Sequence, residues 1–179
     1  MVIVFGGSFN PITIGHKLIV EECIKKYQPE KIIILPTGNS YNKKDLVPFL
    51  DRYKMIEISF NGYSNVIISD IEKNVFKGTY HSLKTLSKTY KDIYFLFGAD
   101  QLDNFSNWLN YNKLIKNFKF IIVKRGEIEI KINDNVKYDI LDFNINTSSK
   151  SFRNTFDSSI IEEKVYNYIV ERGLYKRSV

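Results

Sequence analysis

The stretch FGGSFNPITIGH, residues 5–16, directly follows the apolar run Val2–Val4 and begins with a glycine pair after Phe5. An apolar run of this kind is typical of a central strand buried on both faces of a parallel sheet. Glycines after such a strand let backbone N–H groups approach a phosphate, and a helix beginning near Gly15 points its positive end at the same place. His16, at that helix start, is placed to donate a hydrogen bond to a phosphate oxygen. The whole stretch predicts a nucleotide site, whereas two glycines alone would favour a tight turn beside a solvated histidine.

Strand-like and helix-like segments alternate along the rest of the chain. The further expected strands are Lys31–Pro36, Asn65–Ser69, Ile93–Phe97, Phe120–Val123 and Tyr138–Phe143. The expected helices are Gly15–Tyr27, Phe49–Phe60, Thr79–Tyr90, Leu109–Ile115, Ser148–Phe156 and Ile160–Arg172, the last with a capping box of Ser159 and Glu162 and a C-terminal cap at Gly173. This alternation predicts an α/β fold, a Rossmann-like doubly wound parallel sheet with helices on both faces. Without an internal repeat or a linker, a single domain over residues 1–179 is expected.

The sheet type also predicts where a ligand binds. Ligands of doubly wound sheets lie beyond the carboxyl ends of the strands, so the site is expected between Gly6–His16 and Gly98–Asp100. The polar segment Thr37–Asp45 reads as a loop, in which Lys43 and Lys44 either close over phosphates or remain solvated. The charged segment Glu127–Lys137 reads as a surface excursion.

The composition narrows the class of protein and its partners. The chain of 179 residues has 44% hydrophobic residues, a net charge of +6 and one cysteine, Cys23, so a disulfide framework is excluded and a reducing, cytoplasmic location is expected. No apolar run is long enough for a membrane span, so no membrane partner is expected. This surplus of positive charge is consistent with a partner that carries phosphate groups. A nucleic-acid-binding module is the alternative class, but Lys and Arg are scattered rather than gathered in a stripe, so no nucleic-acid partner is expected.

Several motifs together resemble one family. Residues 13–16, TIGH, match a [HT]xGH signature, and the stretch around them resembles the N-terminal motif of the nucleotidylyltransferase superfamily. Within it, the chain is most similar to bacterial nicotinate-mononucleotide adenylyltransferases. The likeness extends to LDRYKM at 50–55, GTY at 78–80, FGADQL at 97–102 with Trp108, SSKSFR at 148–153 and YIVERGLY at 168–175.

The resemblance implies a reaction and a set of site residues. ATP and nicotinate mononucleotide would give nicotinate adenine dinucleotide and pyrophosphate with Mg²⁺, by positioning and charge stabilisation. His16, Thr13 and Arg153 would be the catalytic residues. The remaining candidates would bind the two substrates: Gly7, Ser8, Phe9, Ser148 and Ser149 near phosphates, Gly98 and Asp100 near ribose or hydrated Mg²⁺, and Trp108, Tyr80 and His81 near the pyridine ring. No metal-ligand cluster is expected, and a homo-oligomer is left open.

Three positions depart from the family pattern. Thr13 stands where histidine is usual, as in phosphopantetheine adenylyltransferases, which are the nearest alternative. His81 stands where threonine is usual, opposite the expected nicotinate carboxylate, so a nicotinamide mononucleotide substrate is a second alternative. Lys150 and Phe152 replace residues of the C-terminal motif, and a nucleotide-binding homologue without activity is the third.

Overall fold

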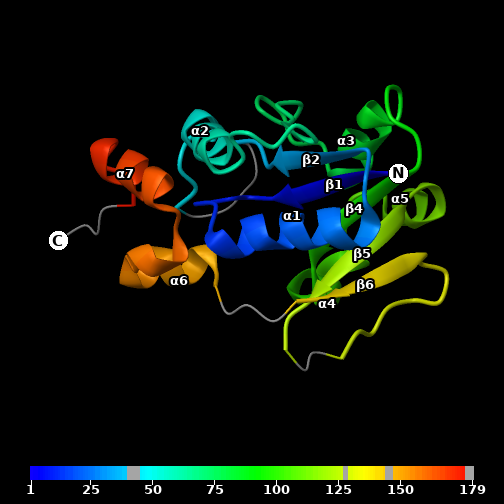
Figure 1. Cartoon of the computed structure of the whole chain (residues 1–179). Helices are drawn as coiled ribbons and strands as arrows, with labels where there is room; N and C mark the ends of the chain where they lie inside the picture. The colour runs from blue at the N-terminus through cyan, green and yellow to red at the C-terminus, as the bar shows by residue number, and fades with distance from the viewer. Residues whose placement is uncertain (40–44, 127–128, 144–146, 176–179) are drawn as a thin grey trace.

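Six parallel strands form one sheet in the computed structural model, which describes residues 1–39, 45–126, 129–143 and 147–175 (Figure 1). The strands are β1 (Val2–Gly7), β2 (Lys31–Pro36), β3 (Val66–Ile68), β4 (Ile93–Gly98), β5 (Lys119–Lys124) and β6 (Tyr138–Asp142). Their order across the sheet is β3-β2-β1-β4-β5-β6, so the order in which successive strands are added to the sheet reverses between β1 and β4. The predicted Rossmann-like α/β fold is confirmed, and its switch point lies at the carboxyl end of β1.

Helices cover both faces of this sheet. They are α1 (Ile14–Tyr27), α2 (Phe49–Ser59), α3 (Thr79–Leu86), α4 (Leu102–Phe105), α5 (Tyr111–Asn117), α6 (Ser149–Thr155) and α7 (Glu163–Glu171), with short 3-10 turns η1 (Ala99–Gln101) and η2 (Ser158–Ile160). The C-terminal helices α6 and α7 lie beyond the carboxyl ends of β1 and β2 (Figure 1). They therefore stand next to the edge of the sheet where a ligand is expected.

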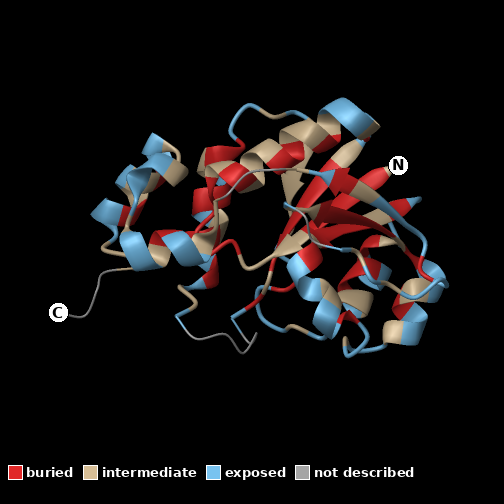
Figure 2. Cartoon of the chain, turned by 90° about the horizontal axis from the view of Figure 1, so that it is seen from below, coloured by how far each residue is buried: buried red, intermediate tan, exposed pale blue. Residues whose placement is uncertain are grey.

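The alternation of side chains along the strands builds two apolar layers. Ile3 and Phe5 of β1 point into one layer, with residues of α1, α2, α6 and α7. Val2 and Val4 point into the other, with residues of α3, α4 and α5. Figure 2 shows the buried residues gathered in the sheet and on the helix sides that face it. Burial on both faces explains why the central strands read as unbroken apolar runs.

Helix ends account for most differences from the sequence prediction. The third helix ends at Leu86 rather than at Tyr90, and α4 was not predicted. The capping box expected at Ser159 and Glu162 is wrong, because Ser159 lies in η2 and Glu162 is itself the N-cap residue of α7, without a side-chain cap. The C-terminal cap is confirmed: Gly173 has φ +63°, and the Leu174 N–H donates to the Ile169 carbonyl at 3.0 Å.

Two expectations fall partly outside the described residues. Lys43 and Lys44, and part of the segment Glu127–Lys137, belong to stretches that the structure does not describe. Among the residues that it does describe, no helix is long and apolar enough to span a membrane.

Candidate active site

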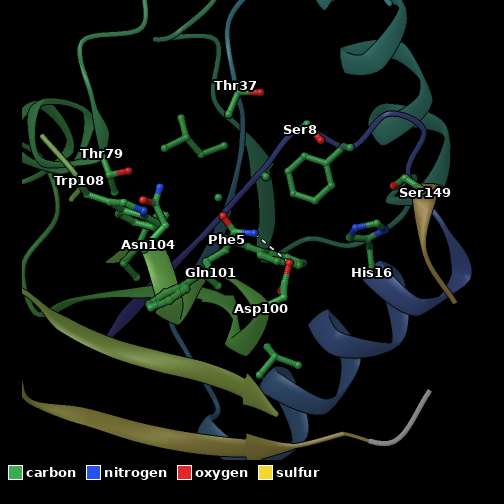
Figure 3. Close-up of a pocket in the computed structure, with 18 of the residues that line it drawn as sticks. Phe5, Ser8, His16, Thr37, Thr79, Asp100, Gln101, Asn104, Trp108 and Ser149 are labelled. Carbon is green, nitrogen blue, oxygen red and sulfur yellow. Dashed lines mark hydrogen bonds between the residues drawn. The ribbon is translucent and has the colours of Figure 1, made fainter. Parts of the chain in front are cut away.

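A cavity of about 690 Å³ opens at the carboxyl ends of β1 and β4, where the sequence predicts a ligand. Figure 3 shows His16 and Ser149 at one end of it and Trp108 and Thr79 at the other. The cavity therefore has a polar end, formed by the first loop, the start of α1 and α6, and an aromatic end, formed around Trp108.

The glycine of the TIGH motif brings the two parts of the polar end together. A Cβ atom on Gly15 would lie 2.1 Å from Oγ1 of Thr147, so any other residue at this position would force the Thr147 side chain, in the segment before α6, to move. Ser149 then donates from Oγ to the Pro11 carbonyl at 2.7 Å. This contact joins residues that are 138 positions apart in the sequence.

His16 lies in the first turn of α1 and lines the cavity. Its Nδ1 atom lies 3.0 Å from the backbone nitrogen of Thr13 and 2.8 Å from Oγ1 of Thr13. The ring packs edge-to-face on Phe9, with the centroids 5.2 Å apart. Phe9 is almost fully buried, and it lines the cavity together with Gly7 and Ser8. Thr13, with 2% of its surface exposed, contacts His16 and is not part of the cavity wall.

Helix α6 contributes the cations of the polar end. Arg153 and Lys150 line the cavity, and Arg153 donates from Nη1 to the Asn10 carbonyl at 2.5 Å. Ser148 accepts a hydrogen bond from the Ser151 N–H at 3.0 Å and is the N-cap residue of α6, yet it also lines the cavity. Ser148 can therefore cap α6 and line the cavity at the same time.

The aromatic end is built around Trp108. Its ring centroid lies 5.3 Å from that of Phe97 and 6.1 Å from that of Phe95, and all three residues line the cavity. Aromatic walls of this kind suit a flat heterocycle. The second wall comes from Thr79 and Leu109.

Two residues expected at the aromatic end lie elsewhere. The Tyr80 ring packs against Phe118, with centroids 6.3 Å apart, and is not part of the cavity wall. His81 is exposed and borders a separate hollow on the outer side of α3, beside Asp70 and Thr85. The rotation of α3 about its axis explains this, because Leu83 and Leu86 direct one face of the helix into the core. In this orientation Thr79 lies at the cavity, whereas Tyr80 and His81 do not.

Asp100 is the exposed carboxylate at the rim of the cavity, in η1 after Gly98. It accepts a hydrogen bond from Nε2 of Gln101 at 2.8 Å, and the N-cap of η1 is Gly98 and not Asp100. The described residues contain no group of three or more His, Cys, Asp or Glu side chains that could hold a metal ion.

Comparison with known proteins identifies the family. A family model described as cytidylyltransferase-like matches residues 4–164. The chain belongs to the cytidylyltransferase-like family. Two relatives are named probable nicotinate-nucleotide adenylyltransferase: that of Acholeplasma laidlawii is 38% identical over 98% of both chains, and that of Caldicellulosiruptor bescii is 31% identical over 98% of this chain and 99% of its own.

Solved structures agree on the fold of this cytidylyltransferase-like chain. The nicotinic acid mononucleotide adenylyltransferase of Plasmodium falciparum, complexed with NaAD, superposes with a TM-score of 0.83 at 24% identity, over 97% of this chain and 96% of that one. A putative nicotinate-nucleotide adenylyltransferase of Vibrio parahaemolyticus superposes with a TM-score of 0.73 at 21% identity, over 99% and 96% of the two chains.

A buried cation that was not among the predicted site residues of this family member contacts the first loop. Arg52 has no exposed surface and donates to the carbonyls of Ser8 at 2.9 Å and Val47 at 3.0 Å. Burial lowers the pKa of its guanidinium to about 10. The signal was present in the sequence, because Arg52 lies one turn from Phe49 and one turn from Ile56 on the apolar face of α2.

A buried carboxyl group in the cavity wall was also missed. Glu72 is 3% exposed, and its Oε1 accepts a hydrogen bond from Oγ of Ser82 at 2.6 Å. Its Oε2 is buried without a hydrogen-bond partner among the described residues. Burial raises the pKa of Glu72 to about 7, against the opposing effects of the Ser82 and Gly38 hydrogen bonds and of Arg52. Nothing in the charged segment around Glu72 distinguishes it from a solvated residue.

Proposed function

We propose that this chain transfers the adenylyl group of ATP to nicotinate mononucleotide, giving nicotinate adenine dinucleotide and pyrophosphate. The observation that carries the proposal is a single cavity lined by His16 of the TIGH motif, by the cations of α6 and by the aromatic wall of Trp108. Relatives named for this activity match almost the whole chain, which supports the same substrates here.

The chemistry requires little of the protein beyond binding and charge stabilisation. A phosphate oxygen of the mononucleotide attacks the α-phosphorus of ATP, the bond to the bridging oxygen of the β-phosphate breaks, and pyrophosphate leaves. The attacking oxygen is already ionised, so no general base is needed. Negative charge builds up on the α-phosphate oxygens and on the leaving group, and donors preorganised around them lower the barrier.

The polar end of the cavity suits the triphosphate. Gly7 and Ser8 border the phosphates, and His16 donates a hydrogen bond to the phosphate that is transferred. Arg153 and Lys150 of α6 neutralise charge on the leaving pyrophosphate. Mg²⁺ would supply further charge neutralisation when it is bound with ATP, held on the protein side by Asp100.

The aromatic end suits the pyridine ring, which Trp108 would stack on or border. Phosphopantetheine is the alternative substrate suggested by Thr13, which contacts His16 and does not line the cavity. Parallel turnover assays with nicotinate mononucleotide, nicotinamide mononucleotide and phosphopantetheine test the assignment. Turnover of phosphopantetheine alone would overturn it, and turnover of the nicotinamide substrate alone would correct the pyridine specificity.

Replacing Arg153 with alanine is expected to raise the KM for ATP about tenfold to hundredfold, because a hydrogen bond to a charged group contributes about 1.5–3 kcal/mol. The KM for the mononucleotide should change much less. The exposed Lys164 on α7 provides a control, since Lys164→Ala removes one positive charge from the same C-terminal region outside the cavity wall. Equal ATP dependence of the two variants would exclude Arg153 from phosphate binding.

Replacing Trp108 with alanine is expected to raise the KM for the mononucleotide about fivefold to hundredfold, the effect of losing about 1–3 kcal/mol of aromatic stacking. Trp108→Phe keeps an aromatic face and should retain most of the affinity. Steady-state kinetics with one substrate varied at a time separates the two KM values, and thermal unfolding controls for the contacts of Trp108 with Phe105 and Phe97. A larger effect on the KM for ATP would place the adenine, not the pyridine, at this wall.

A further inference from the structure

The hydrogen bonds of His16 determine which of its ring nitrogens can carry the proton. The backbone N–H of Thr13 points at Nδ1 of His16 over 3.0 Å, and a backbone N–H can only donate. Nδ1 must therefore present its lone pair. Oγ1 of Thr13, at 2.8 Å from the same nitrogen, then donates its hydroxyl proton as well. A neutral imidazole with a bare Nδ1 carries its proton on Nε2.

We propose that Thr13 is a positioning residue that holds His16 in the neutral Nε2–H tautomer, so that the ring meets the transferred phosphate as an uncharged hydrogen-bond donor. The part of this proposal that concerns the phosphate rests on the proposed function. The part that concerns the tautomer rests on the protein alone. Thr13 thereby acts through His16 and not by touching the substrate.

Three surroundings of the ring favour the same neutral form. His16 lies in the first turn of the 14-residue helix α1, where the helix dipole disfavours a positive charge. The ring lies near the apolar rings of Phe9 and Phe5, with centroids 5.2 Å and 6.1 Å away. A second proton would need a place on Nδ1, which already faces two donors.

The described charged groups that line the cavity are of both signs. The cations that line it are Arg153 and Lys150 of α6 and Arg125 after β5, and each of them opposes a further positive charge. The carboxyl groups in its wall are Asp100 of η1 and Glu72 before α3. The neighbouring Lys17 of α1 pairs with Glu162. In this proposal the arginine and lysine side chains supply the positive charge that stabilises the transition state. His16 supplies an oriented, uncharged hydrogen-bond donor.

Nitrogen NMR of the protein labelled with ¹⁵N-histidine tests the tautomer without any substrate. The chain has two histidines, and a His81→Asn variant assigns the remaining signals to His16. We expect Nδ1 of His16 to be unprotonated and Nε2 to be protonated at neutral pH. A proton on Nδ1 at neutral pH would overturn the proposal.

Variants of Thr13 separate positioning from packing. Thr13→Val keeps the shape and the backbone N–H but removes the hydroxyl donor, so the share of His16 with its proton on Nε2 should fall at neutral pH and kcat should fall about threefold to tenfold, the effect of one hydrogen bond. Thr13→Ser keeps the hydroxyl and should restore both readouts. Unchanged ¹⁵N signals of His16 in Thr13→Val would remove the hydroxyl from the proposal. If the wild-type NMR result is as expected but nicotinate mononucleotide is not a substrate, the proposed function fails and the tautomer assignment stands.

Discussion

Replacing His16 with alanine is expected to lower kcat about 100-fold to 1000-fold, which is the effect of losing one donor preorganised for the transition state. The half-buried ring faces the cavity, so its removal enlarges a space that is already open to solvent. The fold should therefore persist. Steady-state kinetics with both substrates at saturation, together with circular dichroism and thermal unfolding, measures the two quantities separately.

Two amide variants test which atom of His16 carries the effect. Asparagine can place Oδ1 where Nδ1 of the ring stands, so it can still accept the Thr13 N–H, but it has no donor at the position of Nε2. Glutamine reaches that position with an amide N–H. We expect His16→Asn to be as inactive as His16→Ala and His16→Gln to retain part of the turnover. Near-wild-type turnover of His16→Asn would show that the Nε2 donor is not needed.

The polar end of the site could be predicted from sequence because its first half is local. An apolar strand, a glycine turn and a helix within residues 2–27 determine that the loop and His16 lie at the carboxyl edge of the sheet. The second half depends on a contact across 143 positions, between Arg153 and the Asn10 carbonyl. No local pattern encodes this contact, so Arg153 could be assigned only through the resemblance of its motif.

The aromatic end shows what sequence pattern leaves undetermined. Neighbouring positions on a helix point about 100° apart, so a motif can place a helix start correctly while the wrong side chains are assigned to a pocket. This happened at α3, where Thr79 lines the cavity and Tyr80 and His81 do not. Arg52 and Glu72 were missed for a different reason. Charged residues are usually solvated, and the burial of both depends on tertiary packing, of Arg52 against the Ser8 carbonyl and of Glu72 beside Gly38 and Ser82.

The buried carboxyl group of Glu72 should make the stability of the protein depend on pH. Its pKa is raised to about 7 in the fold, from a value of 4.5 for the free side chain, chiefly because burial disfavours the charged form. Between these two values the folded protein keeps a proton that the unfolded chain releases. The contribution of Glu72 to stability is therefore most favourable below pH 4.5 and is lost as the pH rises through about 7.

Glu72→Gln isolates this effect, because glutamine is neutral at every pH and its Oε1 can still accept the Ser82 hydroxyl. Relative to wild type, the variant should have nearly the same free energy of unfolding at about pH 5 and should be more stable by about 3 kcal/mol at about pH 8. Urea unfolding at a series of pH values measures the difference. Glu57→Gln on α2 controls for the loss of one negative charge at an exposed site. A Glu72→Gln difference that stays constant from about pH 5 to about pH 8 would mean that Glu72 is ionised in the fold throughout, with Arg52 compensating its charge.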